Sequence, residues 1–216
     1  MDESDAPGLD DRRRRSPEER RSAIIRAAAE AVAELGYANA TLTEIAQRSG
    51  ASKGLLWHYF ADRDDLMRQA VSSLSESLRA GLVADIDTRA RVPDVVRAVF
   101  VRTALFTRTH TVELEALDQI VHNLRAPDGR RRISILDYKA IYADHTALLR
   151  RGQREGTIRS GDLRMIVVGY QALIDGLIAY LHAHPDLDPI VHAREVAELF
   201  LVGAAEPSEH HPRVGR

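Results

Sequence analysis

Apolar residues recur at every third or fourth position along most of the chain after residue 15, which predicts a series of helices that each bury one face. The buried face of the first helix is expected to contain Ile24, Ala28, Ala31 and Leu35. Ser16, Pro17 and Glu19 have the spacing of a helix start with a capping box, and Gly36 is the expected end. Strand-like alternation is rare, so the pattern predicts an all-α protein.

Two short helices are predicted next, over residues 41–49 and 52–60. Thr41 and Glu44 have the spacing of a capping box at the start of the first, and Gly50 is expected to end it after two turns. Ser52 begins the second almost at once. Two short helices joined by a glycine-containing turn are typical of a helix-turn-helix, whose second helix enters a DNA major groove ~12 Å wide. The core positions of this motif are expected to be Leu42, Ile45, Ala46, Leu56 and Phe60.

The longer predicted helices cover residues 62–78, 93–107, 111–122, 133–155, 162–184 and 188 onward, with a loop over 123–129. Residues 162–184 are apolar around much of the helix, more than one buried side requires. Such a helix is either central in the core of a monomer or paired with a second copy of the chain.

Composition narrows the class of protein. The chain has 216 residues, 44% of them hydrophobic, and no cysteine, which excludes disulfides, thiolate zinc sites and cysteine nucleophiles. No uninterrupted apolar run approaches the ~20 residues that span a bilayer, and the first residues lack the apolar segment of a secretory signal. We therefore expect a cytoplasmic protein with no membrane partner. The net charge is −2, and the one dense basic block is Arg12–Arg15, either a solvated tail or an arm that contacts DNA.

Other site chemistries find little support in the sequence. His182, His184 and His192 lie near one predicted helix end, but a metal site there would need a tertiary arrangement that their spacing does not show. Asp144 and His145 are adjacent on a helix and point in different directions. There is no glycine-rich phosphate loop and no nucleophile elbow. We expect no enzymatic activity, no cofactor and no bound metal.

Three stretches of the N-terminal segment carry a family resemblance: TLTEIA at residues 41–46, GASKGLLWHYF at 50–60 and RDDL at 63–66. Together they resemble the TetR (tetracycline-repressor) family of bacterial regulators. The resemblance covers about residues 18–66 and is specific in order and spacing, whereas the rest of the chain is similar only in its all-helical layout. Leu55 replaces the usual Thr or Ser, Trp57 the usual Tyr, and Arg63 the usual Lys. Leucine can contact a thymine methyl but cannot donate a hydrogen bond, so these changes affect the expected base preference.

The motif positions and their chemistry indicate roles at a DNA interface. Thr41 and Thr43 can offer hydroxyl and backbone N–H groups to a phosphate, and Tyr59 and Arg63 are expected to contact phosphates too. Gly54 allows a close approach of the duplex. The predicted DNA-binding residues are Thr41, Thr43, Ser52, Lys53, Gly54, Leu55, Trp57, His58, Tyr59 and Arg63.

The resemblance also implies a larger regulatory and dimerisation domain. Its last two long helices are expected to pair with their symmetry mates through Ile166, Tyr170, Leu173, Leu177, Val196 and Phe200. A small-molecule pocket is implied in the same domain. Its candidate residues are Phe100, Phe106, His110, Gln119, Tyr138, Tyr142, His145, Tyr170 and Asp175. The mainly hydrophobic composition suggests an apolar or aromatic effector.

We therefore divide the chain into a disordered basic arm (1–15), a three-helix DNA-binding domain (16–66, motif at about 41–60), a helical regulatory and dimerisation domain (67–205) and a disordered tail (206–216). The predicted function is a ligand-responsive transcriptional repressor that binds a palindromic operator as a homodimer. The alternative is a DNA-binding regulator without a small-molecule ligand, controlled by a partner protein.

Overall fold

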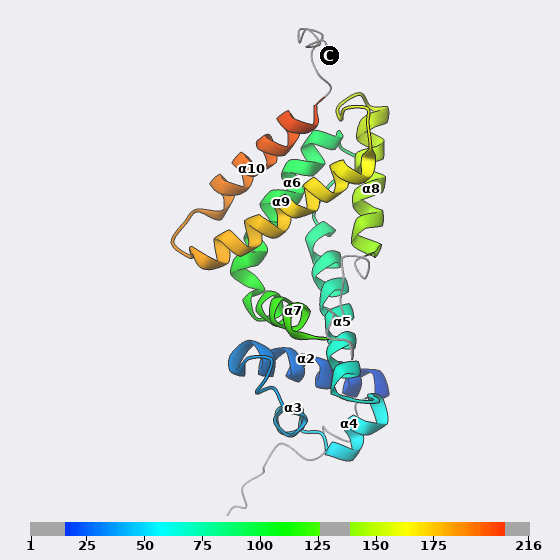
Figure 1. Cartoon of the computed structure of the whole chain (residues 1–216), viewed down its shortest axis with the longest axis vertical. Helices are drawn as coiled ribbons and strands as arrows, with labels where there is room; N and C mark the ends of the chain where they lie inside the picture. Colours follow the sequence, from blue (N-terminus) through cyan, green and yellow to red (C-terminus); the bar gives the residue numbers. More distant parts are fainter. Residues whose placement is uncertain (1–15, 126–138, 206–216) are drawn as a thin grey trace, which may run out of the picture. The chain divides into compact units, whose positions relative to one another are not determined.

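The computed structural model describes residues 16–125 and 139–205, and these residues form helices and no β-strand (Figure 1). The predicted all-α fold is therefore confirmed. The Arg12–Arg15 arm, the tail from residue 206 and Tyr138 lie outside the described residues.

Nine helices make up the described part of the chain, and their bounds agree with the predicted segments to within a few residues in most cases. They are α2 (Pro17–Leu35), α3 (Leu42–Ser49), α4 (Lys53–Tyr59), α5 (Arg63–Val83), α6 (Val92–Thr109), α7 (Thr111–Asn123), α8 (Lys139–Arg154), α9 (Leu163–Ala183) and α10 (Pro189–Ala204). The first part of the helix predicted over residues 133–155 lies outside the described residues.

The chain divides into two compact units, which are described separately. The first consists of residues 1–75 and 112–132, and the second of residues 76–111 and 133–216. This division differs from a boundary after residue 66, because the first part of α5 and most of α7 pack with the N-terminal helices. The buried residues of these two segments are Leu66, Met67, Ala70, Val71, Ala116 and Ile120.

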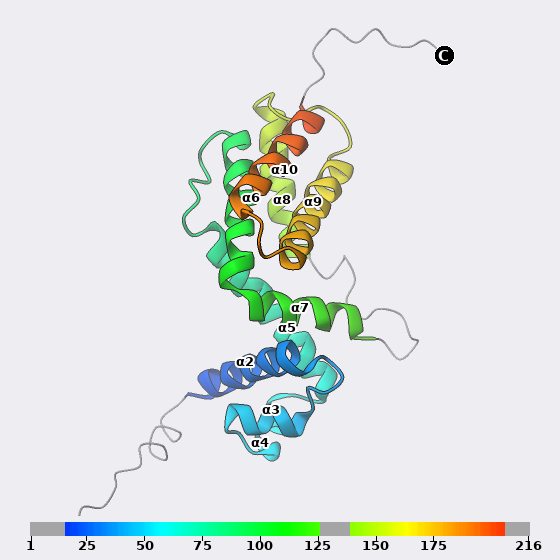
Figure 2. The same ribbon diagram turned by 90° about the vertical axis from the view of Figure 1, so that its left-hand side faces the viewer.

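In the first unit, α3 and α4 lie on the same side of α2 (Figures 1 and 2). Ser16 and Glu19 form the predicted capping box, with Glu19 N–H donating to Ser16 Oγ at 3.1 Å and Ser16 N–H donating to Glu19 Oε2 at 2.7 Å. The predicted buried stripe of α2 is confirmed except at Leu35, which is 38% exposed. The stripe thus ends one turn before the helix ends at Gly36.

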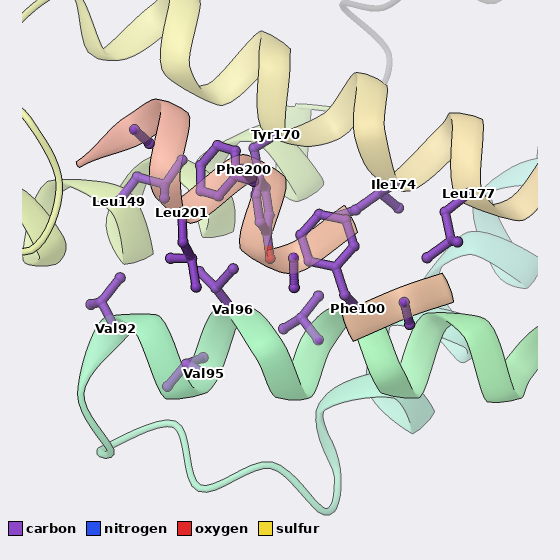
Figure 3. Close-up of a cluster of buried hydrophobic side chains, with 14 of the residues drawn as sticks. Val92, Val95, Val96, Phe100, Leu149, Tyr170, Ile174, Leu177, Phe200 and Leu201 are labelled. Atoms are coloured by element: carbon purple, nitrogen blue, oxygen red, sulfur yellow. The ribbon is translucent and has the colours of Figure 1, made fainter. Parts of the chain in front are cut away.

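The second unit has an apolar core between α6, α8, α9 and α10, and Figure 3 shows its aromatic centre. The Tyr170 ring packs edge-on against Phe100 at 5.5 Å, Phe200 at 5.0 Å and His145 at 4.8 Å between ring centroids. The Tyr170 side chain is completely buried, with 0% of its surface exposed to solvent.

Helix α9 is long and apolar enough, by length and composition alone, to cross a membrane. It also carries Arg164 and Asp175, and one of its faces forms part of the core of the second unit. A core helix of a globular domain has the same character, so the length and composition of α9 carry no argument for a membrane.

Candidate functional site

A tight turn between α3 and α4 sets the start of α4. Gly50 ends α3 in the left-handed conformation (φ 65°, ψ 19°), and its N–H reaches the carbonyl groups of Ala46 and Gln47. Ser52 then caps α4, its Oγ accepting from Leu55 N–H at 3.2 Å. Because a residue with a side chain is strained at that positive φ, glycine is the natural residue at position 50.

Helix α4 has one buried face and one exposed face. Leu56 and Phe60 are 1% and 3% exposed and hold the helix against the first unit, as predicted from the sequence. Trp57 is 54% exposed. Lys53, Gly54 and His58 are also exposed, while Leu55 and Tyr59 are half-buried. The helix therefore presents an outward surface that mixes one cation, one imidazole and two large apolar side chains.

The neighbouring helix α3 carries one arginine, which forms ion pairs within the first unit, and two exposed threonines at its start. Arg48 donates to Glu44 at 2.8 Å and to Glu34 at 2.7 Å. At the start of the same helix, Thr41 Oγ1 accepts from Glu44 N–H at 3.2 Å, and both Thr41 and Thr43 are exposed. The first turn of α3 thus leaves two hydroxyl-bearing side chains accessible, whereas the guanidinium of Arg48 is held by two carboxylates.

The side chain of Arg63, for which the sequence predicts a phosphate contact, donates hydrogen bonds to backbone carbonyl groups of the first unit. At the start of α5, its Nε donates to the carbonyl oxygen of Ala40 at 3.1 Å and its Nη2 donates to that of Tyr37. The guanidinium also lies over the Tyr37 ring, 4.2 Å from the centroid. Tyr37 N–H in turn donates to Gln119 Oε1 at 2.8 Å. Arg63 therefore positions the loop that leads into α3.

Comparison with known proteins places this arrangement in a family. The model of the bacterial regulatory proteins of the tetR family matches residues 24–70, which include the whole helix-turn-helix. A relative from Pseudomonas paraeruginosa, named HTH-type transcriptional regulator BetI, is 30% identical over 164 residues, which are 73% of this chain and 79% of that protein. The chain belongs to the TetR family. It is thus a DNA-binding transcriptional regulator and not an enzyme.

Solved structures share the fold of this TetR-family regulator over most of their length. A TetR-family regulator from Rhodococcus sp. has a TM-score of 0.73 at 21% identity, covering 85% of this chain and 99% of that one. The transcriptional regulator FadR from Bacillus subtilis, solved in complex with stearoyl-CoA, has a TM-score of 0.64 at 19% identity, covering 84% of this chain and 98% of that one. At these identities the likeness concerns the fold alone.

The residues predicted for a dimer interface of this TetR-family regulator require a correction. Four of them form part of the protomer's own core: Ile166, Tyr170, Leu177 and Phe200 are 6%, 0%, 4% and 7% exposed. The other two, Leu173 and Val196, are half-buried against the same core. A side chain that is buried within its own chain is not available to a second copy.

A different set of apolar side chains is exposed on α9 and α10. The large ones are Met165, Val168, Tyr180, Val191, Leu199 and Val202, with exposed fractions of 62%, 40%, 50%, 48%, 65% and 76%. On α9, a Cβ added at Gly169 or Gly176 would meet nothing within 4 Å. Sequence reasoning missed these positions, because a helix that is apolar on more than one side does not show which side is buried.

The structure separates the predicted pocket residues into distinct places. Phe100, His145 and Tyr170 meet in the core of the second unit. Phe106 and His110 stack on each other at 4.2 Å in the same unit, with Arg102 over Phe106. Gln119 does not join them, because it lies in the first unit and accepts the hydrogen bond from Tyr37.

Polar groups of α8 and α9 form a seam beside that aromatic core. His145 Nδ1 and Gln171 Oε1 are buried without a hydrogen-bond partner among the described residues. Gln171 Nε2 donates to Asp175 Oδ1 at 2.7 Å. Asp175 is exposed as a residue, yet partial burial of its carboxyl group raises its pKa. Burial and the charge of Asp175 together raise the pKa of Tyr142 on α8. We call His145, Tyr142, Gln171 and Asp175 the α8–α9 seam.

Proposed function

We propose that the protein is a ligand-responsive repressor, acting in the cytoplasm as a homodimer on a palindromic operator. The observation that carries the DNA-binding part is the outward face of α4. It is braced by Leu56 and Phe60, begins at a tight turn and exposes Trp57 to solvent. A surface that is this apolar and contains no carboxylate suits the floor of a major groove.

The DNA contacts proposed for this face follow from the chemistry of each side chain. Thr41 and Thr43 contact phosphate at the start of α3, and Tyr59 contacts phosphate from the end of α4. Lys53, Leu55, Trp57 and His58 face base edges and the nearby backbone from α4. Gly54 adds no side chain between helix and duplex. Ser52 serves mainly as the cap of α4.

Variants of two residues test the DNA interface. Lys53→Ala and Tyr59→Phe should each weaken operator binding by about 1–3 kcal/mol without changing the far-ultraviolet circular dichroism spectrum. The operator is first located by footprinting on the DNA that flanks the protein's own gene. Affinity should fall steeply with added salt, because phosphate contacts release counterions. Unchanged affinity in both variants would contradict the assignment.

For the homodimer, we propose the exposed apolar side chains of α9 and α10 as the surface that a second copy covers. Their exposure supports it, since Leu199 and Val202 are more than half exposed in the single chain. Gly169 and Gly176 support it too, because the open space around them would let another helix approach closely. A dimer of this kind would present two α4 helices to two half-sites one or more helical turns apart.

A matched pair of variants tests the dimer. Leu199→Glu places a charge on the proposed interface and should convert the protein to a monomer at micromolar concentration in sedimentation velocity. Arg194→Gln, an exposed change on the same helix but roughly 140° around it from Leu199, serves as the control and should leave the dimer intact. A wild-type protein that sediments as a monomer at that concentration would overturn the proposal.

For the effector, we propose a site in the second unit at the α8–α9 seam. The buried His145 Nδ1 and Gln171 Oε1 support it, because neither has a hydrogen-bond partner among the described residues and such groups cost free energy until something bonds to them. The fold of FadR from Bacillus subtilis, which was solved with stearoyl-CoA, shows that a protein of this fold can hold a ligand. A ligand would release DNA by binding more tightly to an arrangement that fits the operator less well.

Footprinting repeated with candidate apolar and aromatic compounds tests the effector. Release of the operator by a compound in wild-type protein, and its loss in Gln171→Leu, would support the seam. Regulation that instead needs a second protein, with no response to any compound, would favour the alternative of a partner-controlled regulator.

A further inference from the structure

The exposed face of α4 has an apolar side chain at each of its two edges, Leu55 at one and Trp57 at the other, and we call these edges its flanks. At 100° per residue, Leu55 and Trp57 lie roughly 160° apart around the helix axis, and Gly54 and His58 lie between them. Trp57 is 54% exposed and Leu55 is half-buried. A Cβ added at Gly54 would have Ser52 Oγ as its nearest neighbour, at 3.9 Å, so the middle of the face is open.

The exposed part of each flank makes no contact that holds the helix in the first unit. Leu56 and Phe60, at 1% and 3% exposed, already fill the core beneath α4. A large indole left in water is a candidate contact surface, since exposed aromatic side chains at a binding face gain free energy when they are covered. The two flanks thus have a chemistry that selects an apolar partner on the DNA.

Helix α4 lacks the side chain that most often recognises guanine in the major groove. An arginine that forms two hydrogen bonds to guanine O6 and N7 is the most frequent specific contact in the major groove. Helix α4, KGLLWHY, contains no arginine. The nearby Arg48 on α3 is held by Glu34 and Glu44 at 2.7 and 2.8 Å. Guanine contacts from α4 are therefore limited to Lys53 and His58.

We propose that Leu55 and Trp57 read thymine methyl groups on opposite strands of each operator half-site. The C5-methyl of thymine is the apolar group on the major-groove edge of the bases, so it is the feature that these side chains can distinguish. A helix lying in the groove turns its two flanks toward the two strands, and the open position at Gly54 lets the backbone come close enough for both to reach. This inference rests on the proposed operator binding and adds its base preference.

The first step of the test is a selection of bound duplexes from a random-sequence pool, using the full chain. The selected half-site should contain thymines on both strands. Each thymine is then replaced singly by deoxyuridine, which removes only the methyl group. We expect about fourfold weaker binding at one position on each strand, the equivalent of burying about one methyl group. Thymines elsewhere in the site should show no effect.

Variants connect each methyl to its side chain. In Leu55→Ala the penalty for deoxyuridine should disappear on one strand, and in Trp57→Ala on the other. Thr43→Ala, a change at a proposed phosphate contact, should weaken binding to all duplexes and keep both penalties. Unaltered circular dichroism spectra show that the variants are folded. All titrations are run by fluorescence anisotropy at low salt, so that weakened complexes remain measurable.

The outcomes separate this inference from the proposed function. A pool in which no sequence is enriched means that the operator binding itself is wrong. Enrichment followed by no deoxyuridine penalty, by penalties that persist in Leu55→Ala and Trp57→Ala, or by a selected half-site without thymines overturns the methyl readout alone.

Discussion

The buried histidine of the α8–α9 seam makes the stability of the protein depend on pH. His145 lies on α8, its ring is 4.8 Å from the Tyr170 ring, and its Nδ1 is buried without a partner among the described residues. Burial lowers the pKa of His145 from 6.5 to about 4, and the negative charge of Asp144 offsets this only in part. The imidazole is therefore neutral in the folded protein near pH 7.

The sign and size of the effect follow from the two protonation equilibria. Below pH 6.5 the unfolded chain binds a proton at this histidine, whereas the folded chain does not until about pH 4. The stability contribution is thus fully present above pH 6.5 and is lost as the pH falls from 6.5 toward 4. The loss is about 2 kcal/mol at pH 5 and about 3 kcal/mol once pH 4 is passed, at roughly 1.4 kcal/mol per pH unit.

The assay is urea denaturation of the second unit's helices at pH 7.5, 6 and 5, comparing the wild type with His145→Phe. Phenylalanine keeps an apolar ring against Tyr170 and removes the titrating group. The free energy of unfolding of the wild type should fall by about 2 kcal/mol more than that of the variant between pH 7.5 and pH 5. Equal falls in the two proteins would refute the reasoning, because all other groups are shared.

Three further variants follow from the glycines and from Arg63. Gly152→Ala would place a Cβ in a steric clash with Ile158 Cγ1 and 2.9 Å from Val92 Cγ1, so we expect a loss of about 1–3 kcal/mol in urea denaturation; unchanged stability would mean that the neighbouring side chains can shift at little cost. Gly54→Ala should leave stability unchanged or slightly higher and weaken operator binding in anisotropy titrations, and full affinity would argue against a close approach there. Arg63→Ala should cost about 1.5–3 kcal/mol of stability through its lost backbone contacts; weaker DNA binding at unchanged stability would instead assign Arg63 to a phosphate.

Local signals in the sequence were sufficient for the helices and for the turn at the DNA-binding site. A capping serine or threonine, a glycine in the left-handed region and the spacing of Leu56 and Phe60 all act within a few residues of one another. The same holds for the exposure of Trp57, because a helix this short has little choice of which side to bury. Such features are readable from sequence because their physical causes are local.

Long-range contacts could not be predicted in this way. The hydrogen bond from the Arg63 side chain to the Tyr37 carbonyl oxygen and the hydrogen bond from Tyr37 N–H to Gln119 each join residues far apart in the chain. The sequence predicts a phosphate contact for Arg63 and an effector contact for Gln119. The structure shows that both side chains make hydrogen bonds within the first unit, which no spacing along the sequence indicates.

The sequence by itself determined that this is an all-helical DNA-binding regulator with its reading helix at residues 53–59, because caps, turns and a family motif all act locally. Only the tertiary structure decided which side of α9 and α10 faces inward. Both helices are apolar on more than one side, so their periodicity has no single phase, and either side could have been buried. In the folded protein one side of each helix is buried in the core around Tyr170, and Met165, Leu199 and Val202 on the other side are exposed.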